Sequence, residues 1–220
     1  MKLEMPGINV ILKEIERVLN EEGFLSLLRQ LFLTFNTFFL YQNNLNSPVI
    51  APEISNLTIK TLSEPEQLEQ LMQQGFTFHS YHMSAQQCKQ RLISGAILFC
   101  AFVGKELAHG SWAATSSNAY SDFHPFHMKY EHTAYIGGTM TIPKYRRKGI
   151  NVYVHSKIFQ YLKEKGISMA IIAIEKDNVI AQDSQNKLGS IMFGKGYYLR
   201  LLFLRFKWLS LKSAPGMPQR

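Results

Sequence analysis

The fold is decided by the stretch Thr139-Met-Thr-Ile-Pro143-Lys-Tyr-Arg146-Arg-Lys-Gly149-Ile-Asn151. The residues that lead into it, 135–142, mix β-branched and aromatic side chains, which favours a strand. Pro143 then turns the chain, and three consecutive cations lead to Gly149. Beyond the turn, residues 152–165 carry Val154, Ile158 and Leu162 at helical spacing. The sequence therefore predicts a strand, a basic turn and a helix in immediate succession.

The start of such a helix is suited to binding an anion. Its first N–H groups have no partner within the helix, and the helix dipole adds positive potential there. Gly149 has no Cβ, so a ligand can approach the backbone closely. Arg146, Arg147 and Lys148 add positive charge around the same point. The alternative is a solvated basic turn without a ligand, because short patterns of this kind also arise by chance.

The turn carries a resemblance to a known family. The pattern Pro143-x-x-Arg146-x-x-Gly149-Ile150 resembles motif A of the GCN5-related N-acetyltransferase (GNAT) superfamily, usually written Q/R-x-x-G-x-G/A. In that superfamily the loop wraps the pyrophosphate of acetyl-CoA. Asn151 stands where the family has Gly or Ala. Asn tolerates unusual backbone angles better than most residues, so the loop can keep its shape.

A second motif agrees with the first and lies at the separation that the family shows. Asn178-x-x-Ala181, followed by Lys187-Leu-Gly189, resembles the family's N-x-x-(A/S)…K-L-G-F segment, with Ser190 in place of Phe. Two such motifs together are far less expected by chance than one. The resemblance covers about residues 57–208.

The composition is that of a folded protein with an excess of positive charge. The 220 residues are 46% hydrophobic and 12% aromatic, and 24 Lys and Arg exceed 16 Asp and Glu. The net charge of +8 suits CoA, an acidic membrane surface or nucleic acid. Nucleic acid is disfavoured, because zinc-finger, homeodomain and ribonucleoprotein signatures are missing from the sequence. With only two cysteines and no signal-peptide pattern, we expect a cytoplasmic protein.

The N-terminal region reads as helical and lies outside the resemblance. Apolar residues recur at helical spacing over 8–21, and a second helix is predicted over 24–41. The second helix approaches the length of a membrane span, but Arg29, Gln30 and Asn36 argue against a span. It would pack on the domain, on a partner subunit in a homodimer, or flat on a membrane. Residues 42–55 read as a linker.

The remaining elements predict an α/β fold with a GNAT-like mixed central sheet flanked by helices, and an added helical N-terminal segment. Strands are expected at 57–62, 96–103, 106–115, 168–174, 190–193 and 197–208, and helices at 63–74, 84–93 and 178–189. We expect an extension and linker at 1–55, the acyltransferase-like domain at 56–210, and a loose tail at 211–220. The run 197–208 is basic and aromatic, so a peripheral membrane contact shared with 24–41 is the alternative to an ordinary hairpin.

The resemblance implies transfer of an acyl group, most simply acetyl from acetyl-CoA, to the amine of a small molecule or of a sugar- or amino-acid-derived acceptor. It implies that backbone groups of Met140, Thr141 and Ile142 hold the pantetheine arm. The pyrophosphate would lie on Arg146, Arg147, Lys148, Gly149, Ile150 and Asn151, with Asn178 in the second cofactor motif. No metal is expected, since His124-x-x-His127 has no matched third ligand.

The acid and base of the reaction are less clearly marked. The position that often holds a Tyr acid in the family is Gln185 here, with Ser184 beside it. The position that often holds a carboxylate base is Tyr135, which could equally be a packing residue. His132 titrates in the useful range and is a second candidate base, although it could be an ordinary surface residue. An acceptor cleft would be flanked by His109, Trp112, His124, Phe126 and His127.

The sequence leaves three activities open. The first is an N-acyltransferase. The second is a module that binds acyl-CoA without turnover, because Gln185 cannot donate a proton to a leaving thiolate. The third is a membrane-associated acyltransferase with a longer acyl donor, suggested by the apolar residues of 24–41.

Overall fold

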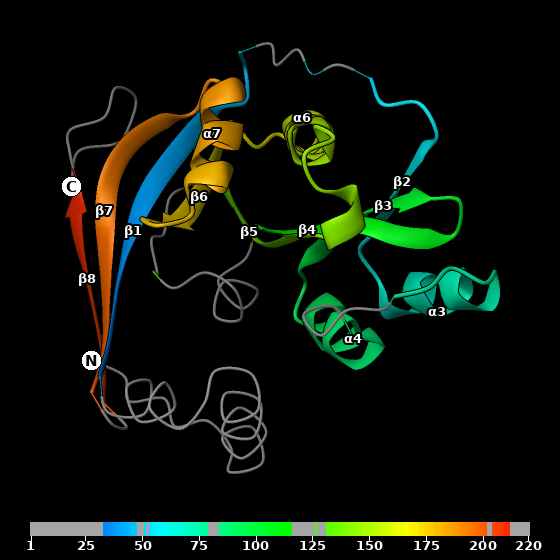
Figure 1. The fold of residues 1–220 in the computed structure, drawn as a ribbon, viewed down its shortest axis with the longest axis horizontal. Coiled ribbons are helices and arrows are strands. Elements are labelled where there is room, and N and C mark those ends of the chain that lie inside the picture. Colours follow the sequence, from blue (N-terminus) through cyan, green and yellow to red (C-terminus); the bar gives the residue numbers. More distant parts are fainter. Residues whose placement is uncertain are drawn as a thin grey trace.

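The computed structural model describes residues 33–47, 51, 53–78, 84–115, 126, 131–201 and 204–211. Within these ranges the chain alternates strands and helices (Figure 1). The elements are β1 (Leu33–Asn44), β2 (Leu57–Leu62), α3 (Pro65–Gln73), α4 (Ala85–Ile93), β3 (Ile97–Val103), β4 (Glu106–Ala114), β5 (Thr133–Thr141), the 3-10 turn η2 (Pro143–Tyr145), α6 (Ile150–Glu164), β6 (Met169–Glu175), α7 (Val179–Lys187), β7 (Ile191–Leu201) and β8 (Leu204–Leu211).

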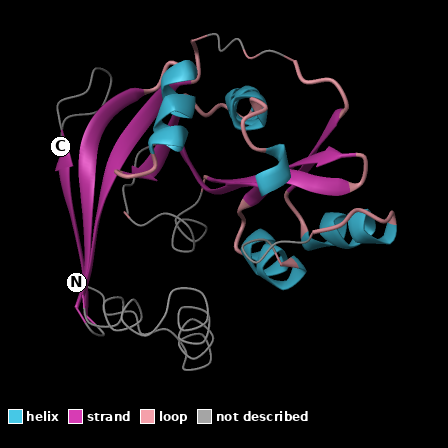
Figure 2. Cartoon of the chain, viewed as in Figure 1, coloured by secondary structure: helices cyan, strands magenta, loops and turns pink. Residues whose placement is uncertain are grey.

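The strands form one mixed sheet with the order β2-β3-β4-β5-β6-β1-β7-β8. Neighbouring strands in this sheet are antiparallel, except β5 and β6. These two run parallel and are joined through α6. Helix α6 lies on one face of the sheet, and α3 and α4 lie on the other (Figure 2). Each face has its own apolar core. Leu68, Leu71, Cys88 and Leu92 pack with Trp112 and Tyr135 on the α3–α4 face, and Val154, Ile158 and Leu162 pack with Ala134 and Ile136 under α6.

The predicted fold class is confirmed, and most predicted elements lie where the sequence placed them. Helix α4 begins after Ser84, whose side chain accepts a hydrogen bond from the Gln87 N–H. Helix α3 begins at Pro65, two residues after the start of the predicted range 63–74. Its cap is Glu64, because the Gln67 side chain reaches back to the N–H groups of Ser63 and Glu64.

The helix predicted over 24–41 is wrong for its second half. Residues 33–44 form strand β1, which pairs with β6 on one side and β7 on the other. Residues 33–41 are mostly apolar and do not alternate strictly, so periodicity alone does not distinguish a strand from a helix here. Phe35, Phe38 and Phe39 also have high strand propensity. The linker predicted over 42–55 therefore includes the end of a strand.

Because β1 pairs within the same sheet as β2–β8, residues 33–44 belong structurally with the domain that we expected to begin at residue 56. The helix predicted over 8–21 and the first part of the one over 24–41 lie outside the described residues. In the described part of the chain, none of the helices combines the length and apolar character that crossing a membrane requires.

The two strands predicted at 190–193 and 197–208 are divided differently in the structure. Strand β7 runs without interruption through Gly194 and Gly196, which lie between the two predicted strands. Both glycines are required by close packing. A Cβ at Gly196 would lie 2.3 Å from the Phe126 ring, and one at Gly194 would lie 2.9 Å from the Leu211 side chain. Membrane contact through 197–208 stays a prediction.

Replacing Gly196 with alanine tests this packing. We expect Gly196→Ala to lower the free energy of unfolding by about 1–3 kcal/mol, because the added methyl group overlaps the Phe126 ring. Chemical denaturation measures the loss. In a Phe126→Leu background the same substitution should lower the free energy of unfolding by clearly less, because the aromatic ring is absent. Equal costs in the two backgrounds would contradict the contact.

Candidate active site

The sheet opens between β5 and β6. The two strands pair in register from Thr133↔Met169 to Ile136↔Ile172, and no further. Both continue beyond that point, β5 to Thr141 and β6 to Glu175, with β5 paired only to β4 and β6 only to β1. The two halves of the sheet diverge accordingly in Figure 1. The last pair, Ile136↔Ile172, is the apex of this opening.

A β-bulge marks the point where β5 leaves its partner. The register to β4 steps from Trp112↔Gly137 to Gly110↔Met140, so β5 carries one extra residue there. Gly138 occupies the bulge with φ +54°, a conformation that L side chains rarely adopt. Gly138 and Thr139 are exposed although they belong to an inner strand of the sheet. The opening is therefore accessible to solvent.

At the C-terminal end of β5, the backbone groups of alternate residues point toward β4 or toward the opening. The Ile142 N–H donates to the Ala108 carbonyl at 3.0 Å, so it is already used within the sheet. Because strand backbone groups alternate in direction, those of Thr141 face away from β4. The Thr141 carbonyl accepts a hydrogen bond from Arg146 Nε at 3.1 Å. This contact holds the exposed Arg146 at the mouth of the opening, the end where β5 leads into the basic turn.

The turn that follows is anchored and then enters α6 in a strained conformation. The Glu106 carboxylate accepts hydrogen bonds from Lys144 and from the Tyr145 hydroxyl, tying the turn to β4. Arg147 has φ +63° and Gly149 has φ +76°. A left-handed Arg is uncommon, and such outliers cluster at functional sites. A Cβ at Gly149 would meet nothing within 4 Å, so open space lies over the helix start.

These parts can hold an anionic, extended ligand. Beyond Ile136, the side of β5 that faces the opening pairs with no other strand among the described residues. Arg146, Arg147 and Lys148 lie at the end of this opening, and α6 offers its first N–H groups beside Gly149. Within the described residues no group of three His, Cys, Asp or Glu could hold a metal ion.

A family model described as acetyltransferase (GNAT) family matches residues 69–189, more than half of the chain. The chain belongs to the acetyltransferase (GNAT) family. No curated protein sequence matches it. The open β5–β6 pair and the basic start of α6 both lie within the matched range.

Solved structures share the fold at low sequence identity. A Drosophila protein has TM-score 0.52 and 10% identity, covering 90% of this chain and 59% of its own. A GCN5-related N-acetyltransferase-like protein from Streptococcus suis has TM-score 0.51 and 9% identity, and the match covers 82% of this chain and 68% of that protein. A GNAT acetyltransferase from Colwellia psychrerythraea has TM-score 0.50 and 15% identity, and the match covers 92% of this chain and 74% of that protein. The chain thus spans less than two thirds of the Drosophila protein.

A buried polar chain links α7 of this GNAT domain to the bulged strand. Gln185 Nε2 donates to His155 Nδ1 on α6 at 3.2 Å. Gln185 Oε1 accepts from the Ser190 hydroxyl at 2.9 Å, which sets the orientation of the amide. His155 Nε2 lies 3.4 Å from Ser111 Oγ and 3.5 Å from Thr139 Oγ1, and these two hydroxyls are 2.7 Å apart. The network therefore reaches from α7 through α6 to β4 and to the bulge of β5.

The protonation state of His155 follows from its partners and its burial. Since Nδ1 accepts the amide hydrogen, the ring proton is on Nε2, facing the two hydroxyls. Burial lowers the pKa of His155 from 6.5 to about 4, so the ring is neutral at physiological pH. His109 faces it at a ring distance of 6.4 Å, and burial lowers the pKa of His109 to about 3. His109 bonds Thr141 Oγ1 at 2.8 Å.

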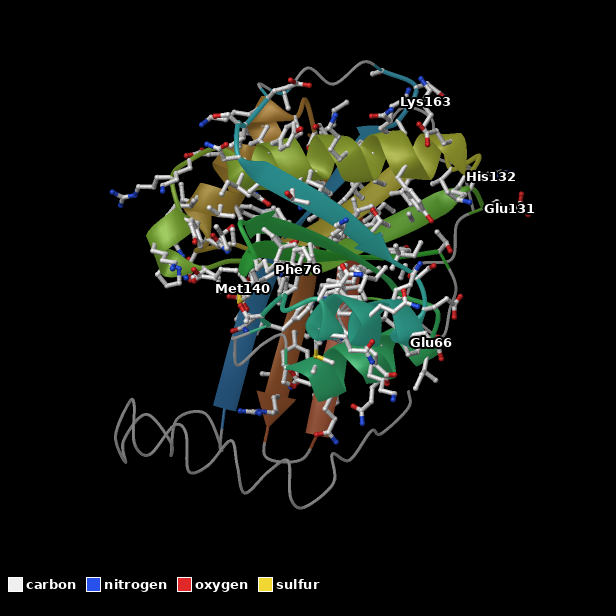
Figure 3. All side chains as sticks on the ribbon, turned by 90° about the vertical axis from the view of Figure 1, so that its right-hand side faces the viewer. Glu66, Phe76, Glu131, His132, Met140 and Lys163 are labelled. Atoms are coloured by element: carbon white, nitrogen blue, oxygen red, sulfur yellow. The ribbon has the colours of Figure 1, made fainter. Side chains whose placement is uncertain are left out.

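The residues predicted to supply acid and base are not brought together. Gln185 is 1% exposed and is bonded to His155, so it faces the interior. Tyr135 is also 1% exposed and packs in the α3–α4 core, one pair before the apex. Ser184 donates to the Ile180 carbonyl on its own helix. His132 lies at the other end of β5, and Figure 3 shows His132 and Met140 on opposite sides of the domain.

Two further sequence predictions change in detail. The Asn178 side-chain oxygen caps α7 by accepting from the Ala181 N–H at 3.2 Å, so it is used within the protein. His109 was expected beside an acceptor cleft, but it is fully buried on the α6 side of the sheet. Phe126 lies in the opposite core with Phe38, and His124 and His127 lie outside the described residues.

Arg91 lies beside the opening, which the sequence did not predict. It comes from α4, and its guanidinium lies over the Trp112 ring at 5.4 Å, beside the bulge. Only a cation at a helical position next to buried Leu92 hinted at a role, because the register that brings α4 over β4 is a tertiary property.

The neutral state of His155 predicts a pH dependence of stability. The folded pKa lies below 6.5, so this contribution is complete above pH 6.5 and is lost as the pH falls toward 4. The shift corresponds to about 3 kcal/mol over that window. We expect His155→Gln to be less stable at pH 8, but to lose less stability on acidification. Denaturant titrations from pH 8 to pH 4 measure both slopes.

Proposed function

We propose that this GNAT protein transfers an acyl group, most simply acetyl, from acyl-CoA to an amine. The observation that carries the proposal is the interrupted β5–β6 ladder, with the basic start of α6 at its open end. An anionic nucleotide head would lie on the loop from Arg146 to Asn151. An extended arm would then follow the unpaired edge of β5 toward the apex.

The dimensions of the strand suit this arrangement. From Ile142 to Gly138 the strand spans about 13 Å at its usual rise per residue. An arm held along this length places its reactive end near the bulge. Because both the loop and the strand belong to rigid, packed elements, the thioester would be held beside an acceptor with little freedom to lose. This proximity is the main contribution that we assign to the protein.

The chemistry needs a bond exchange and two proton movements. The amine nitrogen forms a bond to the acyl carbon as the carbon–sulfur bond breaks, giving an amide and the CoA thiol. We assign removal of the amine proton to water, because Gly138 and Thr139 are exposed at the apex. Gln185 and Tyr135 are each 1% exposed, and His132 lies at the other end of β5, so we assign the proton for the thiolate to water as well.

Gly149 and Gly166 provide a matched test of the cofactor site. They lie at opposite ends of α6 with φ +76° and +77°, and a Cβ at either would meet nothing within 4 Å. Valine therefore imposes similar backbone strain at both positions. We expect Gly149→Val to weaken CoA binding at least tenfold in calorimetry, because the side chain enters the ligand space, while Gly166→Val binds normally. Equal affinity in both variants would refute the placement.

A binding module without turnover is the second candidate. It is favoured by the Gln185–His155 contact, which uses the position of the family's usual acid for structure. Release of thiol from acetyl-CoA, measured against a panel of amines, separates the two candidates. CoA binding without thiol release for every amine would favour the module.

Because we assign the proton transfers to water, we expect a simple pH–rate profile. We expect kcat/KM for an amine to rise about tenfold per pH unit, and to level off only near the pKa of that amine, because only its neutral form attacks. Thiol release between pH 6 and pH 9, with two amines of different pKa, measures this. An inflection near pH 6.5 that is common to both amines and disappears in His132→Asn would show instead that His132 is the base.

A further inference from the structure

We propose that the Thr139 hydroxyl donates a hydrogen bond to the carbonyl oxygen of the acyl-CoA thioester. The inference rests on the proposed acyl transfer and deepens it, because it names a residue that touches the reacting carbonyl. It is carried by the direction of the hydrogen bonds in the buried polar chain. That direction leaves one hydroxyl hydrogen, at the exposed end of the chain, for a ligand.

The direction of the chain is set at Gln185. Its amide oxygen accepts from the Ser190 hydroxyl at 2.9 Å, so its N–H₂ group is turned to His155 Nδ1, 3.2 Å away. Because Nδ1 accepts this bond, the neutral ring of His155 carries its hydrogen on Nε2. Burial lowers the pKa of His155 to about 4, so the ring gains no second hydrogen at physiological pH. His155 therefore donates from Nε2 and accepts nothing there.

Ser111 passes this direction on. Its hydroxyl is buried, and its hydrogen-bond partners among the described residues are His155 Nε2 at 3.4 Å and Thr139 Oγ1 at 2.7 Å. Since His155 Nε2 already bears a hydrogen, Thr139 Oγ1 is the acceptor that remains for the Ser111 hydrogen. The reverse bond, from Thr139 to Ser111, would leave a buried hydroxyl hydrogen without an acceptor in this part of the structure, which is costly.

Thr139 accepts from the interior and donates outward. Its Oγ1 lies within reach of Ser111 Oγ and His155 Nε2, which both present hydrogens, so its lone pairs face these two donors. Its own hydrogen has no acceptor in this trio. Thr139 is exposed although its strand lies inside the sheet, because β5 no longer pairs with β6 at this point. The hydroxyl hydrogen is therefore directed to the opening.

The hydroxyl lies where the reacting carbonyl would be. An arm that follows β5 from the basic turn ends near Gly138, and Thr139 is the neighbouring residue on the side of that turn. On the α3–α4 face the space beside the bulge is filled, since Trp112 Cδ1 lies only 2.9 Å from a Cβ built at Gly138. The opposite face carries the Thr139 hydroxyl, bonded to His155 of α6. A thioester at the bulge therefore meets this hydroxyl.

A donor at this place acts on the charge that develops during transfer. As the amine nitrogen bonds to the acyl carbon, the carbonyl oxygen gains negative charge, and it gives this charge up when the carbon–sulfur bond breaks. A hydroxyl already aimed at the oxygen binds it more strongly as the charge develops. The hydrogen stays on Thr139 throughout, so the proton transfers remain with water. Hydrogen bonds in a chain polarise one another, which makes this hydroxyl a stronger donor.

Infrared spectra of bound acetyl-CoA test the hydrogen bond without any acceptor. Acetyl-CoA with ¹³C at the thioester carbonyl is bound to the protein, and its carbonyl stretch is read from the difference to unlabelled acetyl-CoA. We expect a lower wavenumber in wild type and in Thr139→Ser than in Thr139→Val, which keeps the shape of threonine without the hydroxyl. An equal stretch in all three proteins would overturn the proposal.

The rate of thiol release tests the role in the transition state. With an amine that the protein uses, Thr139→Val should lower kcat about 10- to 100-fold while the affinity for CoA stays the same. Thr139→Ser should restore most of the rate. A carbonyl shift without any loss of kcat would overturn the catalytic role.

Ser111 provides the matched control. Thr139→Val alone leaves the buried Ser111 hydrogen without its acceptor, which can weaken the fold. In Ser111→Ala the His155 Nε2 hydrogen is left to Thr139 Oγ1, so the outward direction of the Thr139 hydroxyl is kept. Ser111→Ala should therefore keep the carbonyl shift, and Ser111→Ala/Thr139→Val should lose it. Melting curves establish that each variant folds, and if Thr139→Val does not, this pair decides.

Nitrogen NMR of His155 tests the direction of the chain without any ligand. In ¹⁵N-labelled protein at pH 7.5 we expect the tautomer with hydrogen on Nε2, assigned through the signals that disappear in His155→Gln. The tautomer with hydrogen on Nδ1 would reverse the chain and overturn the proposal.

The outcomes separate this inference from acyl transfer itself. A carbonyl shift that depends on the Thr139 hydroxyl, without thiol release for any amine, would support the hydrogen bond and overturn the transfer. Thiol release in which neither kcat nor the carbonyl stretch depends on that hydroxyl would overturn the hydrogen bond alone. Failure of acetyl-CoA to bind would overturn both.

Discussion

The structure depends on a parallel strand pair that stops pairing in mid-strand. Strands β5 and β6 share four consecutive residue pairs and then part, although each continues and keeps its other neighbour. Backbone N–H and C=O groups need partners, so a strand edge left open inside a sheet is a place for a ligand backbone or arm. The bulge at Gly138 turns the outer half of β5 away from β6. The basic loop and the start of α6 then lie at the open end by connectivity alone, since η2 and α6 follow β5 directly.

The buried polar chain explains how this opening is kept in shape. Thr139 lies in the bulge, and its hydroxyl belongs to a network with Ser111, His155 and Gln185. The network joins β4, β5, α6 and α7, the elements around the opening. A network of this kind is costly if any member is left unsatisfied, which favours one arrangement of the strands. The position that holds an acid in the family resemblance thus serves here to fix the geometry.

The sequence predicted the strand, turn and helix around Gly149 correctly, because the signals are local: β-branched residues, a proline, and apolar positions at helical spacing. It failed for β1, whose partner strands β6 and β7 lie far along the chain, and for Gly194 and Gly196, whose close neighbours are Leu211 and Phe126. The roles of Gln185 and His155 likewise depend on contacts between residues 30 positions apart. Arg91 and Trp112 meet only through the packing of α4 on β4.

Two groups of positive charge at the two ends of one strand segment give the site a direction. The exposed cations at 146–148 lie at the mouth, and Arg91 lies at the apex on the other face of the sheet. In the proposed transfer, a donor anchored by its diphosphate would enter from the α6 side and follow β5 to the bulge. Since this anchor restricts the donor, its encounter with an acceptor would lose less entropy, and positioning is the contribution that the described residues support.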